Sequence, residues 1–415
     1  MTDGASIVVG GRKSGSWVLI LVLFSAAAFV ETMFWGQLNA FTPLHLARLG
    51  VAPDQIWLWT GITSSVAVAF GLPFLPLWGA LADRYSRQPL IARSFAIYVI
   101  AAIITALAKD VWLFTLGRAV MCFSLGNTGL MMTLLSERAP RHRVAFAFAI
   151  LNAGGPIGAF IGPIIGGPMV DRYGLPGLLE VDSLLLVGVL LALQLGYRDH
   201  FVSGDRRPLL QMAAESLRTL WTAKVFPLIP ALFLLFSGWM LANTFAPIGI
   251  AAMYHGSAHG TAVGLVLGGG GLATLIIAPV MGALADRWGL WRLISVGAVI
   301  EIALWLVLLL CRDLVSFALV WALVNGVASG VFSIAFTILA SSSPIELRGR
   351  IMAFAYLPVN LGALVGATVG TLVSHGSIFA IFPATAALTA AGLAALALAR
   401  KRLVTRAAVT AARDP

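Results

Sequence analysis

The sequence contains a series of apolar runs, each bounded by charged residues and long enough to cross a lipid bilayer as a helix. A spanning helix needs about 20 mainly apolar residues, because every backbone polar group must be hydrogen-bonded within the membrane. The runs predict helices over 17–41, 57–80, 90–108, 111–135, 144–170, 178–197, 225–250, 262–284, 290–310, 314–339, 351–374 and 377–399. We therefore predict an all-α membrane protein with twelve transmembrane helices.

Composition excludes the soluble classes of protein. Of the 415 residues, 60% are hydrophobic and 11% are charged, whereas soluble domains carry roughly 25% charged residues. Cys122 and Cys311 both lie inside apolar runs, and among the six histidines only His255 and His259 have metal-ligand spacing, in a Gly/Ser-rich stretch that is typical of a polar outer loop. We therefore expect no disulfide framework, no metal site and no cofactor.

The basic residues predict the orientation of the chain in the membrane. Of the 27 lysines and arginines, 22 fall in the termini and in one alternate set of loops, and 4 fall in the opposite set. Cytoplasmic loops retain basic residues, so both termini are predicted to be cytoplasmic, in a cell membrane that we take to be a bacterial inner membrane. The net charge of +10 then reflects topology and contact with an anionic inner leaflet. A nucleic-acid partner is not expected.

One segment occurs twice, about half the chain length apart. Pro76–Arg84 (PLWGALADR) recurs as Pro279–Arg287 (PVMGALADR). This repeat predicts an N-terminal six-helix bundle over 1–197 and a C-terminal six-helix bundle with a basic tail over 225–415. A cytoplasmic linker with an amphipathic helix over 198–224 is predicted to join them. Duplicated halves are typical of transporters that work by alternating access.

The repeated segment carries a family resemblance. The sequence GALADRYSR over 79–87 resembles the signature loop of the major facilitator superfamily, and GALADRWG over 282–289 resembles its second copy. Ser86 and Gln88 depart from the family pattern, which prefers Gly and a basic residue there. The resemblance implies the major facilitator fold, with two pseudo-symmetric six-helix bundles in a protein that works as a monomer.

The charges of these loops suggest a gate. A carboxylate at the C-terminal end of a helix is unfavourable unless it is paired, and basic residues follow Asp83 directly. We predict that the two loops hold the halves closed on the cytoplasmic side. The alternative is that the arginines are only markers of topology. The gating residues are Gly79, Asp83, Arg84 and Arg87 in the first loop, and Gly282, Asp286 and Arg287 in the second.

Three ionisable residues lie deep within predicted helices: Glu31, Arg118 and Glu301. Each costs about 2.5–3.5 kcal/mol on insertion scales and therefore needs a reason. At a rise of about 1.5 Å per residue, Glu31 and Arg118 lie at comparable depth. We predict Glu31 as a protonation site and Arg118 as its partner or the group that tunes its pKa; a structural ion pair is the alternative. Glu301 remains open between a second proton site and structural hydrogen bonding.

The fourth and fifth predicted helices each carry a motif. Arg118 with Gly126 resembles the fourth-span motif of proton-coupled members of the superfamily, which implies a role for Arg118 in proton transfer. In the fifth helix, glycine recurs every fourth residue, which predicts close approach of another helix, and Pro163 predicts a bend. The segment 158–167 resembles the antiporter motif of the superfamily, which implies export; small-residue packing alone is the alternative. The residues concerned are Gly154, Gly158, Gly162, Pro163, Gly166 and Gly167.

Aromatic, soft and amide side chains predict a hydrophobic, adaptable cavity. Its candidates are Phe34, Trp35, Gln37, Asn39, Asn127, Met131, Asn243 and Asn325. The resulting hypothesis is a drug:proton antiporter that exports small lipophilic compounds, cationic ones among them. An exporter or flippase of lipids, sugars or metabolites is the alternative on the same fold. A membrane enzyme or receptor is disfavoured, because the sequence offers no nucleophile–base pair, metal cluster or phosphate-binding loop.

Overall fold

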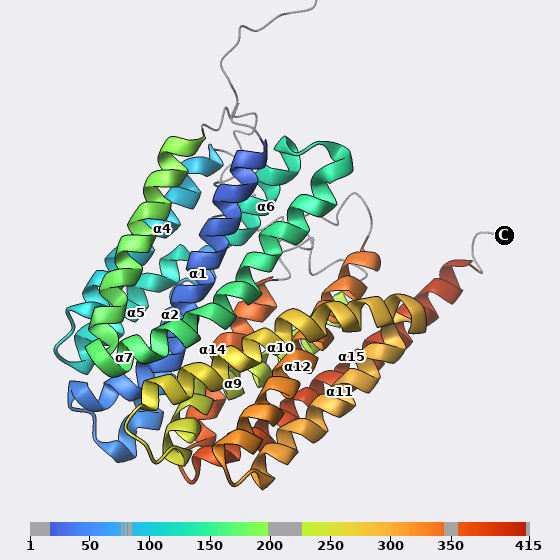
Figure 1. Cartoon of the computed structure of the whole chain (residues 1–415). Helices are drawn as coiled ribbons and strands as arrows, with labels where there is room; N and C mark the ends of the chain where they lie inside the picture. The colour runs from blue at the N-terminus through green and yellow to red at the C-terminus, as the bar shows by residue number, and fades with distance from the viewer. Residues whose placement is uncertain are drawn as a thin grey trace, which may run out of the picture.

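The computed structural model describes residues 17–75, 78, 81, 85–197, 226–343 and 356–411, and among these it contains helices and no strand. The N-terminal half, up to residue 197, contains α1 (Trp17–Leu46), α2 (Ile56–Ala69), α4 (Arg87–Ala106), α5 (Val111–Met121), α6 (Asn127–Arg138) and α7 (Val144–Gly196). The C-terminal half, from residue 226, contains α9 (Ile229–Met253), α10 (His259–Trp288), α11 (Leu290–Val307), α12 (Leu314–Ser341), α14 (Tyr356–Val373) and α15 (Ile381–Ala411). Figure 1 shows the two halves as two groups of helices that lie side by side.

Short 3₁₀ helices begin, end or interrupt several of these elements. They are Ala47–Leu49, Pro53–Gln55, Leu72–Phe74, Cys122–Ser124, Arg141–Arg143, Phe226–Leu228, Leu308–Leu310 and Ile378–Ala380. Ten described helical stretches are long and apolar enough to cross a membrane, and Leu357–Val373 is a shorter apolar helix. The chain is therefore an all-helical, multi-pass protein.

Two of the predicted helices, 144–170 and 178–197, are joined in one element. α7 has 53 residues and would be about 80 Å long if it were straight, against a bilayer core of about 30 Å. Its backbone leaves the helical region at Gly174, with φ 73° and ψ 174°, a conformation that is essentially restricted to glycine. The segments 144–173 and 175–196 consequently run in opposite directions (Figure 1).

The predicted helix over 111–135 is interrupted. α5 ends at Met121, a 3₁₀ turn follows, and Gly126 precedes α6 with φ 93°. A side chain at that φ would clash with the backbone, so glycine permits the break. The interruption determines where Asn127, the first residue of α6, is placed.

The two halves contact each other through α2 with α14 and through α7 with α10. In the first pair, a Cβ at Gly61 would overlap the side chain of Thr371. Farther along the same helices, the hydroxyl oxygens of Ser65 and Thr368 lie 3.4 Å apart. The α7–α10 contact is closer still and is described below.

Candidate functional site

Glu31 lies at the midpoint of α1, the fifteenth of its 30 residues, and is half-buried. The Tyr98 hydroxyl donates a hydrogen bond of 2.7 Å to Glu31 Oε1. The Asn127 amide donates one of 3.0 Å to Glu31 Oε2. Both carboxylate oxygens are therefore bound by neutral donors, one from α4 and one from α6.

The break at Gly126 gives Asn127 its place beside Glu31. Asn127 opens α6 and is 1% exposed. Its Oδ1 has no hydrogen-bond partner, while its Nδ2 binds the carboxylate. A buried amide with one unused acceptor can take up a further donor at this point.

Arg118 does not pair with Glu31 directly. No ion pair joins these two side chains, both of which the structure describes. Arg118 Nη2 instead donates a 2.9 Å hydrogen bond to Asn39 Oδ1. Helical rise predicted a shared depth for the two charges, but it contains no information about which face of each helix they occupy.

Trp35 connects the two groups. The Arg118 guanidinium carbon lies 5.7 Å from the centroid of the Trp35 ring, which is within range of a cation–π contact. The indole N–H of Trp35 donates a 3.1 Å hydrogen bond to the Tyr98 hydroxyl. We call Glu31, Tyr98, Asn127, Trp35, Asn39 and Arg118 the polar network of the N-terminal half. Tyr98 was not a candidate from the sequence, because a single tyrosine in an apolar run carries no signal.

The remaining candidates of the N-terminal half have packing roles in this conformation. Phe34 and Met131 are fully buried in the core, so neither lines open space. Gln37 is also buried, and its Nε2 donates a 3.1 Å hydrogen bond to the Gly162 carbonyl. It therefore joins α1 to α7.

The two candidates of the C-terminal half lie together. Asn325 Oδ1 accepts hydrogen bonds of 2.9 Å from the Trp239 indole and 3.3 Å from Asn243 Nδ2. The Trp239 ring also packs edge-on against Phe236, with ring centroids 5.5 Å apart. These contacts make an aromatic and amide surface, and Trp239 is a member of it that the sequence analysis missed.

Glu301 lies in α11, away from the polar network. It is 2% exposed, and Oε1 accepts hydrogen bonds from the Trp305 indole at 3.1 Å and from the Thr389 hydroxyl at 3.3 Å. These contacts tie α11 to α15. They support structural hydrogen bonding, the second of the two readings of this residue.

The glycines of the fifth predicted helix lie against α1. A Cβ at Gly154 would lie 2.9 Å from the Ser25 carbonyl oxygen, and one at Gly158 would lie 2.5 Å from that of Phe29. At Gly162 and Gly166 the nearest atoms would be a Met33 side-chain carbon at 2.9 Å and a Phe41 ring carbon at 2.7 Å, respectively. The four-residue spacing therefore brings α1 and α7 into close backbone contact from Gly154 to Gly162, and Gly166 continues the contact against side chains of α1.

The opposite face of the same segment lies against α10. A Cβ at Gly264 would lie 2.2 Å from the Pro163 carbonyl oxygen, and one at Gly167 would lie 2.6 Å from the Gly260 carbonyl oxygen. Cβ atoms at Gly268 and Gly271 would also meet α7, at 2.5 and 2.7 Å. We call this contact the glycine seam. Its α10 side was missed, although glycines at 260, 264 and 268 repeat every fourth residue.

The expected gating residues are only partly described. Gly79, Asp83 and Arg84 lie outside the described residues, as do residues 198–224 of the predicted linker. Arg87 forms an ion pair with Glu137 of the same half. The second set of expected gating residues lies in the last turns of α10, which runs to Trp288, and not in a loop. Gly282 has nothing within 4 Å of a Cβ position, and Asp286 and Arg287 are exposed.

A comparison with known protein families identifies the family of this chain. The sequence profile of the Major Facilitator Superfamily matches residues 23–257 and again residues 228–414. The chain belongs to this superfamily. It is therefore a multi-pass membrane transporter and not an enzyme.

The curated relatives are named for drug resistance. The multidrug resistance protein MdtG of Enterobacter lignolyticus is 27% identical over 381 residues, which cover 89% of this chain and 90% of the relative. MdtG of Salmonella paratyphi A is 26% identical over 380 residues, which cover 89% and 93%.

Solved structures of other transporters have the same fold. The POT family transporter PepTSo superposes with a TM-score of 0.74 at 15% identity, over 93% of this chain and 98% of that one. The nucleoside transporter NupG gives a TM-score of 0.72 at 14% identity, over 92% and 99%. The human organic anion transporter MFSD10 gives 0.68 at 15% identity, over 92% and 99%.

Proposed function

We propose that the protein is a proton-coupled antiporter that exports lipophilic compounds, cationic ones among them, by alternating access. The observation that carries the proposal is the Glu31 carboxylate at the midpoint of α1, which only neutral donors bind. A charged carboxylate at membrane depth is costly, so binding a proton there relieves that cost. The names of the MdtG relatives support a drug-like substrate.

Protonation of Glu31 would change the contacts that hold α1. Tyr98 and Asn127 both donate to the carboxylate, and a protonated carboxyl group has one oxygen that becomes a donor. The new O–H group needs an acceptor of its own, so the hydrogen bonds with Tyr98 and Asn127 would rearrange and change how α4 and α6 hold α1. Arg118 would act through Trp35, whose indole fixes the Tyr98 hydroxyl. A cationic substrate and a proton would compete for the same carboxylate.

The proposal includes a membrane arrangement. Twelve spans would form two six-helix bundles over 1–197 and 225–415, joined by the linker 198–224. The sequence repeat and the reversal of α7 at Gly174 support this arrangement, with α5 and α6 as one interrupted span. The basic residues support cytoplasmic termini in a bacterial inner membrane with an anionic inner leaflet. The working unit would be a monomer.

The test is substrate-driven proton flux in proteoliposomes that contain a pH-sensitive dye. Lipophilic cations, neutral drugs and lysolipids are added singly to the wild type and to Glu31→Gln. We expect at least one lipophilic compound to move protons in the wild type and none to do so in the variant. Flux that persists in Glu31→Gln would remove Glu31 from the coupling. Substrate uptake without any proton movement would refute antiport.

Glu301→Gln is the matched control, because it neutralises another buried carboxylate that lies inside a described spanning helix. Its hydrogen bonds come from Trp305 and Thr389, and an amide oxygen accepts both of them. We expect this variant to keep proton coupling. Loss of coupling in Glu301→Gln with retention in Glu31→Gln would assign the proton site to the C-terminal half.

A further inference from the structure

The N-terminal end of α10 is capped by a side chain from the other half of the protein. The residue before α10 is Ala258, which offers no side-chain acceptor. The backbone N–H groups of Gly260 and Thr261 instead donate to the two oxygens of Asp171, at 2.7 and 2.8 Å. The Thr261 hydroxyl donates a third hydrogen bond, of 2.6 Å, to Asp171 Oδ2.

This arrangement differs from the other carboxylate caps. Asp110 caps α5 and Asp313 caps α12, and each directly precedes the helix that it caps. Asp171 belongs to α7 and is 89 residues away in sequence from the N–H that it binds. The first N–H groups of a helix have no partner within the helix, and the helix dipole favours an anion there. Breaking this contact therefore leaves both Asp171 and α10 without their partners.

We propose that Asp171 is the gate residue that holds the two halves together at the end where α10 begins, and that it must release α10 before that end opens. We call this contact the inter-half cap. It stands at one end of the glycine seam, because Gly167, one turn before Asp171 in α7, packs against the capped residue Gly260. The glycine seam brings the backbones of α7 and α10 close together, and the inter-half cap adds directional, charge-assisted hydrogen bonds between the two helices.

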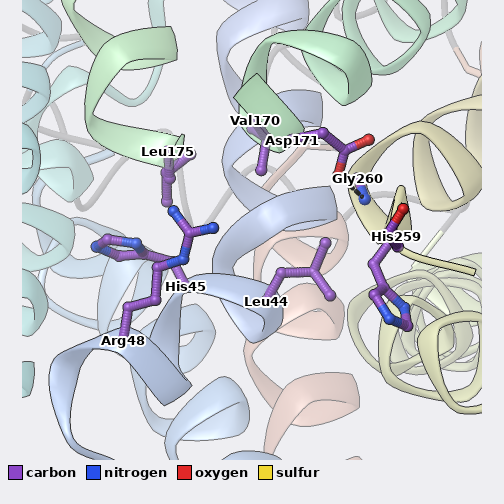
Figure 2. A pocket seen from close by; sticks show the side chains of 9 residues that line it. Leu44, His45, Arg48, Val170, Asp171, Leu175, His259 and Gly260 are labelled. Carbon is purple, nitrogen blue, oxygen red and sulfur yellow. Dashed lines mark hydrogen bonds between the residues drawn. The ribbon is translucent and has the colours of Figure 1, made fainter. Parts of the chain in front are cut away.

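A cavity beside the cap makes its release feasible. It has a volume of about 190 Å³ and is lined by Asp171, Gly260, His259, Arg48 and other residues of both halves. Figure 2 shows these side chains around the cavity, with Asp171 next to the first turn of α10. The cavity is large enough for water, which can hydrate the carboxylate and the freed N–H groups when they separate. The inter-half cap can therefore open without leaving the Asp171 carboxylate buried and without a hydrogen-bond partner.

The inference does not depend on proton coupling or on the substrate, so it can fail independently of the proposed function. The test is a distance measurement between two spin labels by double electron–electron resonance, without substrate. The labels replace Gln55, in the loop between α1 and α2, and Arg312, in the loop between α11 and α12, on a Cys122→Ser, Cys311→Ser background. Both label sites are exposed, and the order of the helices puts both loops at the end where α10 begins.

We expect Asp171→Ala to raise the ratio of long to short distances about fivefold, equivalent to the roughly 1 kcal/mol lost when alanine replaces an N-cap residue. Asp171→Asn keeps one acceptor oxygen and Thr261→Val removes only the hydroxyl donor, so each should raise the ratio less. Asp110→Ala is the matched control, because it removes a cap that lies within one half, and it should leave the distances unchanged. The inference is overturned if the Asp171 variants keep the wild-type distribution, or if Asp110→Ala shifts it equally. If neither Asp171 variant folds, an unchanged distribution in Thr261→Val overturns it.

Discussion

The contact between α1 and α7 predicts that Gly158 tolerates no side chain. In Gly158→Ala, the new Cβ would lie 2.5 Å from the Phe29 carbonyl oxygen and 3.0 Å from the Met33 amide nitrogen. Both are backbone atoms, so neither can rotate away. Ordinary van der Waals contact begins at 3.4 Å, so the two helices must separate by about 0.9 Å. Overpacking of this kind costs about 1–3 kcal/mol.

Gly188→Ala, in the segment of α7 that follows Gly174, supplies the control. Gly188 has nothing within 4 Å of its Cβ position, so this variant gains only the helix propensity of alanine, at most about 1 kcal/mol. The difference between the two variants isolates the packing cost. It is measured as the free energy of unfolding of purified protein titrated with SDS in mixed micelles. We expect Gly158→Ala to be less stable than Gly188→Ala by about 1–3 kcal/mol. Equal stabilities would show that α1 and α7 do not pack as described.

Three further predictions concern individual contacts. Asn325→Ala leaves the Trp239 indole without its acceptor and should lower the free energy of unfolding by about 1–3 kcal/mol, as measured in the same SDS titration. Gly174→Ala places a side chain at φ 73° and should cost about 1–3 kcal/mol; an unchanged thermal midpoint would contradict the bend. Hydrogen bonds from Ser316 lower the pKa of Asp313 below its ordinary value of 3.8, so its stabilisation is present above that pH and is lost as the pH falls through the lowered pKa. The difference in thermal midpoint between the wild type and Asp313→Ala should therefore be constant at neutral pH and disappear only in strong acid.

The sequence predicted helix positions and close packing well, because both depend on local patterns. Apolar runs located most helices to within a few residues, although α2 ends at Ala69 and not at 80, and α15 runs to Ala411 and not to 399. Four-residue glycine spacing identified a surface of α7 that another helix approaches closely. That spacing did not identify α1 as the partner, nor α10 on the opposite face of α7. Which helices become neighbours depends on the three-dimensional arrangement, about which a single helix pattern contains no information.

The candidate site shows the same limit. Glu31 and Arg118 stood out because charge is rare at membrane depth, and depth follows from counting residues. The rotation of each helix about its axis does not follow from counting, so the sequence could not decide between a direct partner and a more remote tuning group, nor show that Trp35 and Tyr98 intervene. Asp171 gave no signal, because an aspartate near a helix end is ordinary unless the helix that it caps is known.

The glycine seam also bears on how this protein can evolve. Much of the contact between the two halves there is made by backbone atoms, such as the carbonyl oxygens of Pro163 and Gly260. Under the proposed function, we therefore expect substitutions that change selectivity elsewhere, for example on the surface around Trp239 and Asn325. Substitutions in the seam would instead alter how fast the halves separate for every compound alike. Under the proposed function, the protein could therefore acquire new substrates while the glycine seam, at which its two halves separate, stays constant.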